Sequence, residues 1–375
     1  MRIYNYLTRI YKVLPFSLFI FIFLFLVPNL HANENDVDAE KKFDAGTTIM
    51  EHVVDAHEWH ILTIGDKHVS IPLPIILLHE NKLHVFSSSR FHHGESTYKG
   101  FAIHKKNGIK DEIIKVDENG ERNENASFVD FSITKNVLTL FMSVIVLCWL
   151  LLSAARSYKK NGHGSPKGAA RIVEPLLLFV RDDIIKPSIG PKYEKFLPYL
   201  LTLFFFILFN NLFGLIPFFP GGANLTGNIS VTFVLAFFTL IITNVSGNKH
   251  YWKHVFNTPG VPWWLKFPLP LMPIVELVGL ITKPVVLMIR LFANITAGHI
   301  ITLGFISLIF ILGEISVAVG YGVSVASIIF YIFMGLLELL VAFIQAYVFT
   351  LLSSIYIGMA VEEHPEEENS ITEIH

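Results

Sequence analysis

The sequence contains a single cysteine and few charged residues. Cys148 lies in an apolar run, so the chain can form neither an internal disulfide nor a cysteine-based metal site. Charged residues make up only 16% of the sequence. No basic tract with interleaved aromatics occurs, so nothing indicates nucleic-acid binding. No G-x-x-x-x-G-K-[ST] phosphate loop occurs either, and the sequence predicts no nucleotide chemistry, no catalytic site and no cofactor.

Apolar residues dominate the chain. They account for 52% of the 375 residues, 33 of which are phenylalanine, and several runs are long enough to span a bilayer. The sequence therefore predicts an all-α polytopic membrane protein with about five transmembrane helices.

Residues 1–32 have the features of a secretory signal peptide. A basic start is followed by the apolar run "LPFSLFIFIFLFLV" and by "LHA", which ends at Ala32. Because Leu30 occupies a position where a small residue is preferred, an uncleaved anchor helix is the alternative. Both interpretations predict that the following residues are exported.

Residues 33–130 are polar and predict a small β-rich domain outside the membrane. A short helix is expected near 44–57, and "HILTIG", "HVSIPLPIILL" and "KLHVFSSS" have the composition of strands separated by turns. The pair His57 and His60 has the spacing of metal ligands on a helix, but no third ligand is evident, so the domain is expected to hold no metal.

The membrane domain is expected over residues 131–361, with an acidic tail at 362–375. Spans are predicted at 133–155, 196–217 and 229–247, and a helix lying at the membrane interface at 172–185. The loops at 156–171 and 248–256 are basic, whereas the loop at 218–228 is uncharged. The positive-inside rule therefore places the basic loops and the C-terminus in the cytoplasm, and residues 33–130 in the periplasm.

The last apolar stretch, from about 269 to 360, has no clear polar break. Hydropathy allows three helices, or two long helices with a turn near "VGYGVS" at 319–324. Two long helices would have to tilt steeply in a hydrocarbon core of about 30 Å.

Polar residues in this stretch recur at helical spacing. Glu276, Lys283 and Arg290 are seven apart, so they fall on one side of a helix. Glu338 and Gln345 repeat the pattern in the last helix. Buried polar contacts between helices would explain some of these residues.

Arg290 is harder to explain as a structural residue. It has no acidic residue three or four positions away, and no lysine or arginine follows it. An arginine in a bilayer is costly and cannot release its proton, whereas His299 and Glu338 can titrate. A fixed cation beside titratable groups has the chemistry of a two-step proton path with a barrier.

"RLFANITAGH" at 290–299 and "ELLVAFIQAYVFTLLSSIYIGMAVEEH" at 338–364 together resemble subunit a of the bacterial F-type ATP synthase, over roughly residues 130–365. The resemblance implies a stator proton channel in the inner membrane, in which two offset half-channels meet a ring of c subunits. It also implies two long tilted helices, a b-subunit peripheral stalk, and the rest of the ATP synthase complex as partners.

The resemblance also implies roles for individual residues. Arg290 corresponds to the essential arginine, Asn294 to its neighbour and Gln345 to its partner on the last helix. The remaining channel positions are Glu276 in the cytoplasmic half-channel, and His299, Glu338 and Asn211 in the outer one. The acid and the imidazole of the outer pair are exchanged relative to better-known members, and Gly214 replaces a common acidic residue.

Two other functions remain as alternatives. A secondary transporter could use Arg290 to bind an anionic substrate, but the two related halves of such proteins are not visible in the sequence. A membrane anchor for the exported domain would leave the polar positions unexplained.

Overall fold

The computed structural model describes residues 44–64, 67–94, 96–106, 110–117, 122–123, 127–161, 168–216, 221–256 and 271–362. The predicted signal peptide and the tail beyond Glu362 lie outside these residues. Within them, five helical segments are long and apolar enough to cross a membrane: Lys135–Ser157, Ala170–Gly214, Ile229–Ser246, Pro273–Ile315 and Val317–Val361. Together with a small β-rich region before them, they confirm the predicted fold class.

The β-rich region begins with helix α2 (Ala45–Val53), and its described residues form seven strands in three antiparallel sheets. Strands β1 (Glu58–Ile64) and β2 (Lys67–Pro72) form one sheet, and β5 (Phe101–Lys106) and β6 (Lys110–Lys115) form another. The third sheet has the order β4 (Lys82–Ser87), β3 (Pro74–His79), β7 (Phe128–Asp130). A core of Ile75, Leu77, Phe91, Phe101 and Ile113 holds this region together.

The sequence predicted α2 and three strand-like runs, of which the second contains both β2 and β3, but not β5, β6 and β7. Those three strands carry several charged side chains, so their alternation of apolar and polar residues is weak.

Helix α3 (Lys135–Asn161) follows the β-rich region. The next segment comprises α4 (Ala170–Phe179), η2 (Val180–Ile185) and α5 (Lys186–Ile189). The helix breaks at Gly190, where φ is +74°, a conformation that favours glycine, and the short η3 (Gly190–Lys192) leads into α6 (Tyr193–Gly214).

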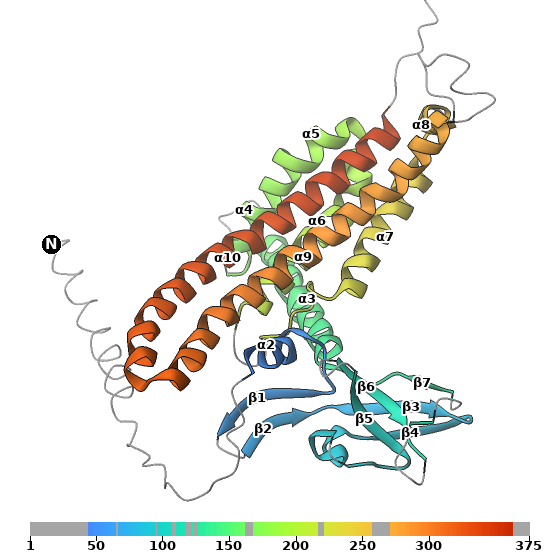
Figure 1. The fold of residues 1–375 in the computed structure, drawn as a ribbon. Coiled ribbons are helices and arrows are strands. Elements are labelled where there is room, and N and C mark those ends of the chain that lie inside the picture. The colour runs from blue at the N-terminus through green and yellow to red at the C-terminus, as the bar shows by residue number, and fades with distance from the viewer. Residues whose placement is uncertain are drawn as a thin grey trace, which may run out of the picture. The chain divides into compact units, whose positions relative to one another are not determined.

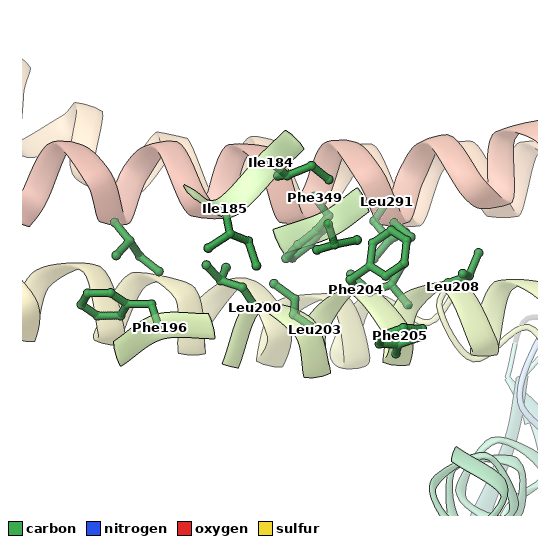
Figure 2. Packing of buried hydrophobic residues seen from close by; sticks show 14 of the residues in the cluster. Ile184, Ile185, Phe196, Leu200, Leu203, Phe204, Phe205, Leu208, Leu291 and Phe349 are labelled. Carbon is green, nitrogen blue, oxygen red and sulfur yellow. The ribbon is translucent and has the colours of Figure 1, made fainter. Parts of the chain in front are cut away.

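Residues 172–185, which were predicted to lie at the membrane interface, pack against the helical bundle in the structure. Val180, Ile184 and Ile185 are fully buried in the main apolar core, to which α6 contributes the largest share of side chains. Figure 2 shows Leu200 and Leu203 of α6 beside Ile185, across from α10. The apolar side of the segment is therefore covered by protein.

Helix α7 (Ile229–Ser246) is followed by the short α8 (Lys249–Phe256) and then by two 45-residue helices, α9 (Leu271–Ile315) and α10 (Val317–Val361). These two helices lie side by side over their whole length (Figure 1). Each would be about 67 Å long at 1.5 Å per residue, more than twice the hydrocarbon thickness.

Only Ser316, in an extended conformation, separates α9 from α10, so the turn precedes the predicted "VGYGVS". Gly320, the first glycine of this motif, lies against Gly313 of α9. A Cβ on Gly320 would lie 2.9 Å from the Cα of Gly313, so their absence of side chains lets the two helices approach closely beside the turn.

Candidate functional site

The polar residues of the last two helices fall into two regions, separated along α9 by Arg290. The first region surrounds Glu338, which is 6% exposed and projects from α10. The Nδ1 atom of His299 on α9 lies 2.8 Å from its Oε1 atom, and the Thr302 hydroxyl donates a hydrogen bond of 3.1 Å to its Oε2 atom. Oε1 accepts no well-aligned hydrogen bond among the described residues, so its contact with His299 is a close approach that becomes an ion pair only when His299 is protonated and Glu338 is ionised.

Two glycines make room for this pair. A Cβ on Gly298 would lie 3.1 Å from Glu338 Oε1, so the carboxylate lies directly against the α9 backbone. A Cβ on Gly214 of α6 would lie 3.4 Å from His299 Nε2. The imidazole therefore contacts Glu338 through one nitrogen and faces the bare backbone of α6 with the other.

A chain of polar contacts lies at the same end of α6. Asn211, 2% exposed, donates a hydrogen bond of 3.0 Å to the Ala342 carbonyl on α10 and accepts one of 2.7 Å from Thr226. Thr296 on α9 donates to the Gly227 carbonyl at 3.3 Å. The loop before α7 is thus folded into the bundle between α6, α9 and α10.

The second region is a small pocket between α7, α8, α9 and α10. Its lining includes Lys283, Tyr356, Thr243 and Tyr251. The Lys283 ammonium lies 5.7 Å from the centre of the Tyr356 ring, a cation–π contact, so Lys283 is held inside the bundle.

Glu276 is close enough to act on Tyr251, which lies on α8. Burial raises the pKa of Tyr251 above its usual value, and the negative charge of Glu276 raises it further. The Tyr251 hydroxyl donates a hydrogen bond of 3.0 Å to Asn244 Oδ1.

Arg290 and Asn294 lie on the exposed side of α9. Nine residues separate Arg290 from His299, a rotation of about 180°, so the two side chains leave α9 on opposite sides. Among the described residues, Arg290 takes part in no hydrogen bond or ion pair, and none joins it to Gln345, which is 6% exposed on α10. The structure therefore brings His299 and Glu338 together but not Arg290 and Gln345.

Sequence reasoning missed Thr226, Thr296 and Thr302. Thr302 carried a signal, since it follows His299 by one helical turn on the same side. Thr226 and Thr296 carried none, because their contacts depend on how the loop before α7 folds.

Comparisons with known proteins match two parts of the chain. The family model described as ATP synthase A chain matches residues 137–358. A second model, described as a domain of unknown function (DUF8433), matches residues 48–131.

Several curated bacterial proteins are similar over the same part of the chain. ATP synthase subunit a 2 of Chlorobaculum tepidum is 47% identical over 255 residues, which cover 66% of this chain and 69% of that protein. ATP synthase subunit a of Pelodictyon phaeoclathratiforme is 45% identical over 253 residues (66% and 71%), and that of Chloroherpeton thalassium 41% over 255 residues (66% and 72%). The match to the family model covers more than half of the chain, and with these relatives it establishes that the chain belongs to the ATP synthase A chain family.

Proposed function

We propose that the chain is the proton-conducting stator subunit of a rotary ATP synthase, with Arg290 as the barrier between two half-channels. One observation carries the proposal. Arg290 lies on α9 between two polar regions, about 10 Å beyond Lys283 and about 13 Å before His299 at 1.5 Å per residue. Apolar side chains of α9, namely Leu287, Leu291 and Ile295, are buried over the same stretch.

The outer half-channel consists of Asn211, His299 and Glu338. Each of the two titratable groups can accept a proton and pass it on, and they are in contact at 2.8 Å. The inner half-channel is the pocket at Lys283 and Tyr356, with Glu276 at its entrance.

Between these regions a proton has to leave this chain. Arg290 keeps its own proton, and its exposed guanidinium lowers the pKa of any carboxyl group that approaches it from outside. A ring of c subunits with a carboxylate at this depth would take up a proton from one half-channel and release it to the other. Asn294 lies one helical turn after Arg290 on α9, and Gln345 lies on the neighbouring α10. Both residues position Arg290 and the carboxylate of the ring relative to each other.

The proposed function also gives a role to each remaining part of the chain. Residues 1–32 are the export signal, 33–130 a periplasmic extension, 131–361 the channel in the inner membrane and 362–375 a cytoplasmic tail. The basic loops at 156–171 and 248–256 support this orientation. A b-subunit peripheral stalk holds the chain against the rotating ring.

The test replaces Arg290 and measures proton uptake and ATP synthesis in membrane vesicles, with co-purification of the ring as the control for assembly. Arg290→Ala should abolish ATP synthesis and allow a passive proton leak, because nothing then prevents protons from crossing directly. Arg290→Lys should also fail, since a desolvated lysine can lose its proton. An assembled Arg290→Ala complex that makes ATP at the normal rate would contradict the proposal.

A secondary transporter that binds an anion at Arg290 predicts a different result. Substrate uptake would then be lost without any change in proton leak, and no ring would co-purify. The family match favours the ATP synthase over this alternative.

A further inference from the structure

The three-stranded sheet of the β-rich region has an apolar side that the described part of the chain leaves uncovered. Ile75 and Leu77 of β3 are fully buried, so the alternate residues Ile76 and Leu78 point to the opposite side. Strand pairing places Val85 beside Ile76.

The exposed side extends over all three strands. Leu78 pairs with Leu83 on β4 and with Val129 on β7, and Phe131 continues β7 past Ile76. Leu83 is 64% exposed, Val85 56%, Val129 50% and Phe131 60%. We call these four residues, with Ile76 and Leu78, the apolar sheet face. Clustered apolar side chains on one side of a sheet indicate a surface that is covered in the working protein.

The chain between this sheet and the first membrane helix is short and tied down. The Phe131 and Ile133 amides donate to the Ile76 and Pro74 carbonyls on β3 at 2.9 and 3.0 Å. The amides of Lys135 and Asn136, at the start of α3, donate to the Ala56 carbonyl and to Asp55 Oδ1, both at 2.9 Å. The sheet is therefore fixed to α3 rather than attached by a free linker.

Distance limits where the sheet can lie. Four residues from Phe131 to Lys135 reach at most about 14 Å when fully extended. The headgroup layer on each side of a bilayer is about 5–8 Å deep. The apolar sheet face therefore begins next to the headgroups of the membrane that α3 enters.

Helix α3 itself exposes large apolar side chains on one side. Phe141, Ile145 and Trp149 follow one another at four-residue spacing and are 54%, 66% and 67% exposed. In a membrane this exposed side of α3 would face lipid, which a sheet fixed to the first turn of the helix could reach.

We propose that the apolar sheet face binds the surface of the bilayer, with its side chains in the headgroup and upper acyl region. The extension then serves as a second membrane contact of the stator, on the side where α3 begins. Burial of the apolar side chains at the membrane–water interface provides the free energy of binding, as it does for amphipathic helices that lie in the membrane plane.

The experiment uses the whole ATP synthase complex in vesicles of phosphatidylcholine and phosphatidylglycerol. Cys148 is replaced by serine, and a nitroxide label is attached to a cysteine at Leu83 or, in a second variant, at Val129. The matched control carries the label at His104, an exposed position on β5 in a different sheet. Accessibility to oxygen, which concentrates in lipid, is compared with accessibility to a water-soluble nickel chelate.

Labels at 83 and 129 should be reached more readily by oxygen than by the nickel chelate, and the label at 104 should show the reverse order. The proposal is overturned if nickel reaches position 83 as freely as position 104, because the face is then in water. Exclusion of both reagents from position 83 also overturns it, because a protein partner then covers the face. The proposal is also overturned if oxygen reaches the labels at all three positions more readily than nickel does. Contact with lipid would then not be specific to the apolar sheet face.

Discussion

At the scale of single residues, the pair of His299 and Glu338 depends on the absence of a side chain at Gly298. The Oε1 atom of Glu338 lies 3.1 Å from the place where a Cβ would be, so a methyl group there would push the carboxylate aside. Substitution of Gly298 therefore tests the pair without changing either titratable group.

We expect Gly298→Ala to displace the Glu338 carboxylate from His299 and to lower proton-driven ATP synthesis about tenfold, which corresponds to a rise of about 1.4 kcal/mol in the barrier to proton transfer. The measurement is ATP synthesis in vesicles at a fixed proton gradient. Gly304→Ala is the control, because a Cβ there has no atom within 4 Å among the described residues. Equal activity of the two variants would show that the position of Glu338 does not matter.

A second pair of residues holds the end of β7. His57 is 5% exposed, and its Nε2 atom lies 3.6 Å from Asp130 Oδ2. Burial alone would raise the pKa of Asp130, but the contacts with His57 and Ser132 outweigh it and lower the pKa below the usual 3.8. Asp130 therefore stabilises the fold at any pH above about 3.8, and this contribution disappears as the pH falls through the lowered pKa.

Near neutral pH, Asp130→Asn should accordingly lower the protection of the first amides of α3 against hydrogen exchange. Below pH 3.8 the substitution should have progressively less effect on this protection. Hydrogen exchange of the Lys135 and Asn136 amides, compared between the two proteins at each pH, measures this difference. A difference that stays constant down to pH 2 would assign the effect to something other than the charge of Asp130.

At the scale of helices and strands, the sequence predicted the apolar spans well because their hydropathy is strong. It could not locate the end of α9, because Gly320 and Gly322 look like turn residues although they lie inside α10. It also could not show that η2 packs into the bundle. Charged residues occur both on a helix that lies at the surface and on the exposed side of a helix that packs into a bundle. Arg181 and Asp182 form such an exposed pair at 2.8 Å.

The candidate site was predicted only in part, for a related reason. Local spacing identified the polar sides of α9 and α10. The contacts of Thr226 and Asn211, in contrast, join segments 15 residues apart in the sequence through a loop whose fold has no periodic signal.

The close approach of α10 to α5 gives a prediction at this scale. A Cβ on Gly358 would overlap the Ser188 carbonyl oxygen, which is a backbone atom and cannot turn aside. Gly358→Ala should therefore separate the two helices and lower the stability of the bundle by about 1–3 kcal/mol, the usual cost of overpacking.

The thermal midpoint of the purified complex in detergent measures this effect. Gly335→Ala on the same helix is the control, since a Cβ there meets no described atom within 4 Å and alanine favours the helix by about 1 kcal/mol. If Gly358→Ala is as stable as this control, α5 does not pack tightly against α10.

At the scale of the whole molecule, the proposed orientation can be tested by labelling. In a Cys148→Ser background, Ser96→Cys should react with an impermeant thiol reagent added to cells with a permeabilised outer membrane, because residues 33–130 are expected outside. Ser370→Cys should react only after the inner membrane is opened. The opposite pattern would reverse the topology and exchange the two half-channels.

The hairpin of α9 and α10 also constrains how the protein is made. No lysine or arginine follows Arg290, so no cytoplasmic cation can retain the end of α10 on its own side during insertion. The short turn that must be carried across the membrane has Glu314 as its nearest charge, and its transfer is correspondingly easy. In the proposed topology, the last two helices would therefore have to take their direction from the earlier basic loops. With this topology, biogenesis would require the first three spans to be correctly inserted before the two longest helices leave the ribosome.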